Sequence, residues 1–191
     1  MAEGEREPFA DIAFTRSVKA MQSRLGSRAR MERLERAGRR QAEMNDTILA
    51  FVAARRSFYL GTASAAGRPY IQHRGGPAGF VSSPDARHLE FADLAGNGQY
   101  ITLGNLSENP RAFIFMMDYY TRTRVKFWGR AEVLAPDGPD RRIRFTVEAW
   151  DVNCRQHIPE LVALDAVREA MTKLEERNRA LEAKLVRLRG G

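Results

Sequence analysis

Cysteine and long apolar runs are scarce in this sequence. Its 191 residues include one cysteine, Cys154, which cannot form a disulfide within the chain and favours a reducing compartment. No apolar run approaches the roughly 20 residues that a membrane-spanning helix needs, so we expect no membrane partner. Residues 1–6 are charged and contain no apolar segment, so we expect no secretory signal. These absences together predict a cytoplasmic protein.

Metal-ligand patterns are scarce as well. The three histidines and the single cysteine show no spacing typical of a metal site, and we predict none. Cys154 is either a reactive thiol or a buried structural residue. We favour the structural role, because His157 is the one base near it in the sequence.

Positive charge is present in excess. The chain has 31 Lys and Arg against 24 Asp and Glu, a formal net charge of +7, and its pI is about 10.1. Such a chain can bind nucleic acid or an anionic ligand such as a phosphate. Most of the arginines alternate with glutamates in presumed helices, which is typical of solvent-exposed faces. Because zinc-finger and RNA-recognition motifs are also lacking, we do not expect a nucleic-acid partner.

Residues 1–45 form the first predicted segment and have a helical pattern. Apolar residues recur every three or four positions from Phe14 to Leu25, and Gly26-Ser27 ends that run. A second helix is predicted over 29–44. The pair Asn45-Asp46 is predicted to cap a third helix over 47–53, whose apolar residues would pack on the domain that follows.

Residues 46–158 form the second segment, a β-rich domain. Aromatic and β-branched runs punctuated by glycine and proline predict strands, and we place six of them at 57–64, 68–74, 88–93, 111–117, 124–133 and 143–150. A short helix opens at 96–100 and ends before Asn109-Pro110. Alternation in the last strand puts Ile143, Phe145, Val147 and Ala149 on one face. The pattern predicts a mainly β (α+β) fold, a six-stranded antiparallel split β-barrel with N-terminal helices and a long C-terminal helix.

Residues 159–191 form the third segment, which has a heptad pattern. Apolar residues repeat with alternating steps of three and four, with one polar residue, Asn178, among them: Leu164, Val167, Met171, Leu174, Asn178, Leu181, Leu185 and Leu188. Leucine at d with one asparagine at a favours a parallel two-stranded coiled coil. Glu169 with Lys173 and Glu175 with Arg179 are predicted to add i,i+4 support. The alternative is a single amphipathic helix packed on its own barrel.

The order of elements over 57–133 resembles the pyridoxamine 5'-phosphate oxidase-like family of FMN-binding split-barrel proteins. Three short motifs carry the resemblance: Tyr70-Ile71-Gln72-His73-Arg74, Gly96-Asn97-Gly98-Gln99-Tyr100, and Arg124-Val125-Lys126-Phe127-Trp128-Gly129-Arg130. It spans residues 46–157. The resemblance implies a homodimeric flavoprotein oxidoreductase with FMN at the subunit interface and a small-molecule substrate of unknown identity. Redox chemistry would belong to the flavin, and no side chain is assigned a catalytic role.

Two motifs in the first half of the domain are implied to hold the cofactor. The strand with Gln72, His73 and Arg74 matches the one that lines the flavin in these oxidases. Arg74 suits a bidentate phosphate contact, with a surface arginine at a strand end as the alternative. Asp93, Asn97 and Gln99 belong to the turn before the helix, where free amides attract anions. Asn97 has plain helix capping as its alternative, and Gln99 stands where the oxidases carry a basic residue.

Two further motifs are implied to complete the site. Arg124 stands where the oxidases carry a glutamine that reaches the flavin from the other subunit, and Lys126 shares its face. Trp150 resembles a tryptophan that contacts the flavin, and Arg155 and His157 resemble a pair that binds the substrate phosphate, with a spacing one residue shorter.

Two alternatives to the flavoprotein hypothesis remain open. The first is a binding module of the same fold with another cofactor, such as deazaflavin F420 or haem, or with none. The second is a basic nucleic-acid-binding or scaffold protein that uses the helices and the coiled coil. A yellow protein with a flavin spectrum would separate the flavoprotein from the first alternative. A steep salt dependence of DNA affinity without a bound chromophore would favour the second.

Overall fold

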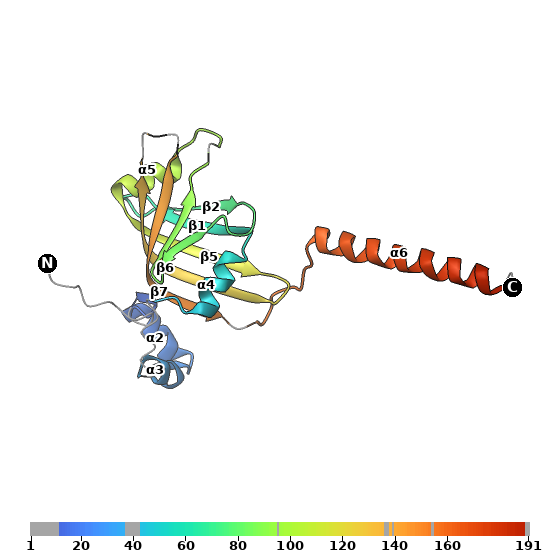
Figure 1. The fold of residues 1–191 in the computed structure, drawn as a ribbon. Helices are drawn as coiled ribbons and strands as arrows, with labels where there is room; N and C mark the ends of the chain where they lie inside the picture. The colour runs from blue at the N-terminus through green and yellow to red at the C-terminus, as the bar shows by residue number, and fades with distance from the viewer. Residues whose placement is uncertain are drawn as a thin grey trace.

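A seven-stranded antiparallel sheet forms the body of the molecule (Figure 1). The computed structural model describes residues 12–36, 43–94, 96–135, 138, 140–153 and 155–189. The strands are β1 (Ser57–Ala63), β2 (Pro69–Gly75), β3 (Ser82–Asp85), β4 (His88–Ala92), β5 (Arg111–Asp118), β6 (Thr123–Leu134) and β7 (Arg142–Asn153). The helices are α2 (Arg16–Arg24), α3 (Arg28–Arg36), α4 (Asp46–Ala53), α5 (Ile101–Glu108) and α6 (Leu164–Arg189).

The predicted class is confirmed, whereas the predicted strand number is wrong. The sheet is mainly antiparallel, with N-terminal helices and a long C-terminal helix. It has seven strands rather than six, because β3 is only four residues long and contains Pro84, so it carries no readable alternation. The hydrogen-bonded order is β2-β1-β5-β6-β7-β4-β3. This order ends in two edge strands, β2 and β3, and does not close by backbone pairing within the described residues.

The core lies on the inner face of this sheet. Fully buried residues come from β1, β4, β5, β6 and β7, and include Phe58, Leu60, Leu89, Phe91, Ile114, Phe127 and Phe145. Phe58 stands edge-on to Phe91, with ring centroids 4.9 Å apart. Phe58 belongs to β1 and Phe91 to β4, which are second from either end of the hydrogen-bonded order. Strands from the two halves of the sheet therefore share one core.

A β-bulge divides β7 into two parts. Ile143, Phe145 and Val147 share the inner face as predicted, but the register with β6 shifts between Trp128 and Gly129. After the shift Ala149 lies opposite Trp128 on the outer face, and Trp150 lies opposite the buried Phe127. A Cβ at Gly129 would collide with the Thr146 carbonyl and the Phe145 ring, so the bulge requires glycine there. The prediction of one face from Ile143 to Ala149 is therefore wrong at its last residue.

The N-terminal helices agree with the sequence in part. Asn45 caps α4, accepting a hydrogen bond from the Ile48 amide at 3.0 Å, and Ile48 and Val52 are buried against the sheet as expected. The second helix is described over Arg28–Arg36 as α3, and the prediction that it reaches Met44 is wrong, because Met44 is not helical. The Met44 amide instead donates to the Ala86 carbonyl at 2.7 Å. Residues 37–42 lie outside the described residues, as does Cys154.

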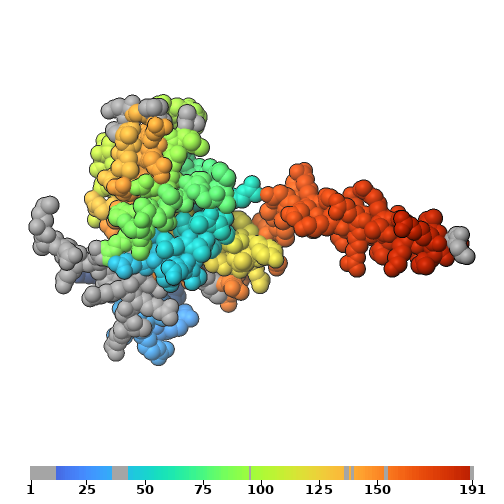
Figure 2. All heavy atoms as spheres, in the orientation of Figure 1, coloured from blue at the N-terminus to red at the C-terminus, as the bar shows by residue number. Residues whose placement is uncertain are grey.

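The C-terminal helix stands away from the body (Figure 2). None of the residues of α6 is buried, so the alternative of a helix packed on its own barrel does not describe this structure. The two predicted i,i+4 pairs are present, with Lys173 2.6 Å from Glu169 and Arg179 3.8 Å from Glu175. Within the described residues, no helix has both the length and the apolar content needed to cross a membrane.

Arg55 and Asp118 join α4 to the end of β5. Arg55 Nη2 lies 2.9 Å from Asp118 Oδ2, and both side chains are less than one-fifth exposed. Arg55 also donates to the carbonyls of Phe51 and Met117, at 3.0 and 3.3 Å. Burial alone would raise the pKa of Asp118, but hydrogen bonds from Arg55 and Thr121 outweigh it and lower the pKa below its ordinary value.

We predict that Asp118→Asn lowers the free energy of unfolding at pH 7 by about 1–3 kcal/mol. Because the folded pKa of Asp118 is depressed, its contribution is complete above the unfolded pKa of about 3.9 and is lost as the pH falls through the folded value. Urea unfolding of wild type and variant from pH 7 to pH 3 measures the difference, with exposed Glu160→Gln as control. A difference that stays constant over this range would mean that charge is not responsible.

Candidate functional site

An open cleft lies between β2, the loop after β4 and the start of α5. The cleft is partly open to solvent and has a cavity volume of about 50 Å³. The described residues that line it are Tyr70, Gln72, Arg74, Asp93, Leu94, Gly96, Asn97, Gly98, Gln99, Tyr100, Ile101, Thr102, Leu103 and Arg141. This is the place where an edge strand, a helix N-terminus and charged side chains meet.

Asp93 is the centre of the charged wall. Its Oδ1 accepts a hydrogen bond from Arg74 Nη1 at 2.7 Å, and its Oδ2 accepts one from Arg141 Nε at 2.6 Å. The Asp93 side chain is only 7% exposed, and those of Arg74 and Arg141 are 11% and 19% exposed. One carboxylate thus serves two guanidinium groups, and the cluster keeps a net charge of +1.

The topology explains why these three side chains meet. Arg74 alternates onto the inner side of β2 with Tyr70 and Gln72. Asp93 follows the last residue of β4, and Arg141 precedes the first residue of β7, its antiparallel neighbour. The Asp93 amide donates to the Arg141 carbonyl at 2.9 Å, which extends that ladder by one bond. The cluster therefore links the edge strand β2 to the paired ends of β4 and β7.

Arg74 has one hydrogen-bonding group that is not satisfied. Its Nε is buried and has no partner among the described residues. A buried N–H without an acceptor costs about 1–3 kcal/mol, and such a group in a native structure calls for an explanation. An anionic oxygen bound in the cleft would supply the acceptor.

The start of α5 gives the cleft a second anion-attracting feature. Its N-cap, Tyr100, has a φ of +48° and makes no side-chain capping bond. The first-turn residues Ile101, Thr102 and Leu103 line the cleft. Amides of a first helical turn lack intrahelical acceptors and carry the positive end of the helix dipole. An anion in the cleft would therefore meet both the arginines and the helix terminus.

The loop before α5 is organised by its own side chains. Asn97 Oδ1 accepts from the Gln99 amide at 3.2 Å, and Asn97 Nδ2 donates to Gln99 Oε1 at 3.1 Å. Asn97 therefore forms a local turn rather than the helix cap that was its alternative role. Farther in, the Thr102 hydroxyl donates to Gln72 Oε1 at 2.7 Å and orients the Gln72 side chain from the neighbouring element.

The structure brings five of the predicted site residues to this cleft: Gln72, Arg74, Asp93, Asn97 and Gln99. His73 does not join them, because alternation along β2 turns it to the outer face of the sheet. There its ring stands edge-on to Tyr59, with centroids 5.7 Å apart.

Arg124 and Lys126 also lie on the outer face, on β6. Lys126 Nζ is 3.4 Å from Asp151 and 5.1 Å from the centroid of the Trp128 ring. Trp128 is half-buried there and packs edge-on against Phe113, with ring centroids 5.0 Å apart. With the exposed side chains of Tyr59 and Ile71, these residues make the outer face a mixed surface of aromatic and cationic groups.

Trp150 lies in the core and not in the cleft. It is 5% exposed, and its indole N–H donates to the Glu43 carbonyl at 3.1 Å, holding the segment before α4 against the sheet. Arg155 and His157 lie in the exposed turn after β7, and neither is among the residues that line the cleft. The C-terminal motif therefore stays apart from the predicted residues that line the cleft.

Sequence reasoning missed Arg141, Thr102 and Tyr100. Arg141 could have been found only by predicting that β4 pairs with β7, since the end of one strand then lies beside the start of the other. Thr102 and Tyr100 lie within the predicted helix region, but the resemblance assigned no residue of this region beyond Gln99 to the site. The left-handed conformation of Tyr100 has no signal in the sequence, since it is uncommon outside glycine and asparagine.

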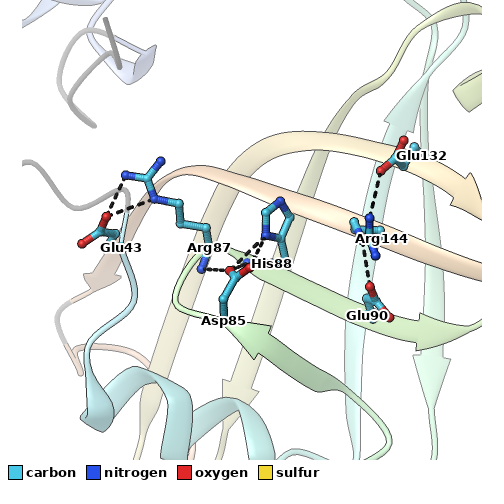
Figure 3. Close-up of polar contacts among 7 residues, drawn as sticks. All are labelled: Glu43, Asp85, Arg87, His88, Glu90, Glu132 and Arg144. Carbon is cyan, nitrogen blue, oxygen red and sulfur yellow. Dashed lines mark hydrogen bonds and ion pairs between the residues drawn. The ribbon is translucent and has the colours of Figure 1, made fainter. Parts of the chain in front are cut away.

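A second charged cluster lies on β4, β6 and β7 (Figure 3). Arg144 Nε is 2.7 Å from Glu90, and its Nη1 is 3.8 Å from Glu132; the hydrogen bond to Glu90 raises the pKa of Arg144. His88 Nδ1 lies 2.8 Å from Asp85 at the turn between β3 and β4. These are cross-strand and turn contacts, and they stabilise the sheet rather than form a site.

The chain matches one protein family over the part of the sequence that contains the cleft. The family model described as "Pyridoxamine 5'-phosphate oxidase" matches residues 44–170, which include all the residues that line the cleft. None of the curated proteins compared with the chain matches it.

Several solved structures resemble the chain at low identity. HupZ of Group A Streptococcus is 16% identical, with a TM-score of 0.47 over 62% of this chain and 100% of its own. A FAD-binding protein of Mesorhizobium loti is 16% identical, with a TM-score of 0.44 over 57% and 94%. HutZ, the haem storage protein of Vibrio cholerae, is 18% identical, with a TM-score of 0.38 over 55% and 89%. Likenesses this weak do not identify the ligand of this chain.

We predict that Asp93→Asn has opposite effects on stability and on anion binding. Loss of the charge between two arginines should lower the free energy of unfolding by about 1–3 kcal/mol. The cleft would then carry a charge of +2, so inorganic phosphate should raise the melting temperature of the variant more than that of wild type. Thermal unfolding with and without phosphate measures both effects.

Asp140→Asn is the matched control, because it removes the same charge from an exposed residue next to Arg141. A variant of Asp93 that keeps wild-type stability, or that gains nothing from phosphate, would contradict the role given to this carboxylate.

Proposed function

The chain belongs to the pyridoxamine 5'-phosphate oxidase family, and from this premise we propose that it is an FMN-binding flavoprotein oxidoreductase acting on a small-molecule substrate. The observation that carries the proposal is the buried Nε of Arg74, which has no partner among the described residues. It accompanies a start of α5 whose N-cap, Tyr100, makes no side-chain capping bond. A phosphate there would satisfy the arginine and meet the helix dipole at the same time. The single cysteine supports a cytoplasmic location.

The residues of the cleft fit both parts of FMN. Arg74 and Arg141 would hold the phosphate, with the amides of the first turn of α5 next to them. Aromatic and apolar surface for the planar flavin ring would come from Tyr70, Tyr100 and Ile101. Histidine, a common axial ligand of haem, is not among the described residues that line the cleft, which favours a flavin over haem.

The chain's own part in the chemistry is to bind and orient. FMN, when bound, supplies the hydride chemistry. Thr102 fixes Gln72 Oε1 as an acceptor, so the Gln72 side chain presents its NH2 group as a donor. The exposed mouth, lined by Leu94 and Tyr100, leaves room for a substrate to approach.

The outer face of the sheet supports a homodimer. Tyr59 and Ile71 are 42% and 68% exposed, and Phe113 and Trp128 continue this surface across β5 and β6. Exposed apolar patches of this kind mark interaction sites. We place the second subunit on this face, where Arg124 and Lys126 would approach the partner's flavin and stabilise its anionic reduced form. Arg155 and His157 remain proposed ligands of a substrate phosphate at this interface.

We predict that the purified chain binds FMN at one site per chain, and that Arg74→Ala weakens FMN more than riboflavin. A charge-assisted hydrogen bond to phosphate contributes roughly 1.5–3 kcal/mol, about 10- to 150-fold in affinity, and riboflavin has no phosphate. Titration monitored by quenching of flavin fluorescence gives both dissociation constants.

Arg68→Ala is the control, since it removes an exposed arginine from the start of the same strand. An equal loss of FMN and riboflavin would mean that Arg74 acts through the fold alone. An absence of flavin quenching at micromolar protein, with a haem or F420 spectrum instead, would overturn the proposal itself.

A further inference from the structure

We propose that α6 pairs with α6 of a second copy of this chain in a parallel, in-register, two-stranded coiled coil, with Asn178 facing Asn178 of the partner subunit. The inference concerns an interaction surface outside the cleft. It does not depend on the bound cofactor.

The helix buries none of its residues against its own body, and Figure 2 shows it projecting from the sheet. Near its first turn Arg56 Nη1 lies 2.7 Å from Asp165 Oδ2, which lowers the pKa of Asp165. Both side chains of this pair are about two-thirds exposed, so the pair buries none of the apolar surface of the helix.

The apolar residues of α6 form one continuous stripe. Seven of them occupy a and d positions over four heptads, and all seven are exposed: Leu164, Val167, Met171, Leu174, Leu181, Leu185 and Leu188. At 1.5 Å per residue, 26 residues extend about 39 Å. A stripe with a strict period of 3.5 is the narrow seam of a coiled coil, whereas a helix that packs on a globular core has a wider apolar face.

Asn178 indicates that the partner is a second copy in parallel orientation. It is the one polar residue in the stripe, at an a position. In a parallel, in-register pair a positions face each other, so the two amides hydrogen-bond. In an antiparallel pair a faces d, and every d position of α6 is Leu or Val, which would leave the buried amide without a partner.

Charge at the flanking positions gives one attractive and one repulsive pair. In a parallel pair the g residue of one helix lies beside the e residue of the next heptad in the other. Arg177 at g would lie beside Glu182 at e of the partner subunit, and the twofold axis produces this pair twice. Lys184 and Arg189 are both cationic and would repel each other near the C-terminal end, where both side chains are exposed to solvent.

Cysteine cross-linking of the full-length chain tests orientation and register together. In a chain with Cys154→Ser, Asn178→Cys should form a disulfide-linked dimer under mild oxidation, since facing a positions place the two thiols within reach. The control Glu176→Cys puts a thiol on the outer side of the coil. We expect Asn178→Cys to cross-link at least roughly tenfold faster than this control.

Substitution of residues in the apolar stripe provides a second test of the proposal. In the Asn178→Cys chain, Leu174→Glu with Leu181→Glu should reduce cross-linking to the level of the control. Thr172→Glu with Ala180→Glu adds the same charges off the stripe and should leave it unchanged. Equal cross-linking at 178 and 176, or no effect of the d-position glutamates, would overturn the proposal. Flavin titration of the same variants reports separately on the cleft.

Discussion

The ion pairs of Asp93 with Arg74 and Arg141 are the contacts on which the arrangement of the cleft depends. The hydrogen-bonded order of the sheet begins at β2 and continues through four other strands before it reaches β4. Arg74 and Asp93 bring these distant strands together through side chains, over 2.7 Å. Arg141 fixes the other carboxylate oxygen. Without this carboxylate two guanidinium groups would face each other in a mostly buried place, and the wall of the cleft would lose its order.

The two faces of the sheet have different roles. Because side chains alternate along each strand, neighbouring residues lie on opposite faces. On β2, Arg74 enters the cleft whereas His73 turns outward. On β6, Phe127 fills the core whereas Lys126 and Trp128 stay on the outer face. The outer face and the helix α6 leave apolar surface exposed, while the cleft keeps a surplus of positive charge.

Local patterns were enough to predict most strands, because strand alternation and punctuation by glycine and proline are properties of neighbouring residues. Five residues of the cleft were predicted from the resemblance of short motifs to the oxidase family. What local patterns could not predict depends on pairing between distant segments. Arg141 joins the cleft only because β7 lies beside β4. Trp150 turns into the core only because of the bulge at Gly129. The strand β3 was not predicted, because its four residues include a proline and do not alternate between polar and apolar.

We propose that the phosphate of FMN binds beside Arg74. A crystal structure of the purified chain with FMN tests this proposal directly. The account predicts a phosphate oxygen within hydrogen-bond distance of Arg74 Nε, about 2.7–3.2 Å, next to the first turn of α5. A flavin bound elsewhere, or a phosphate that leaves Arg74 Nε without an acceptor, would contradict it.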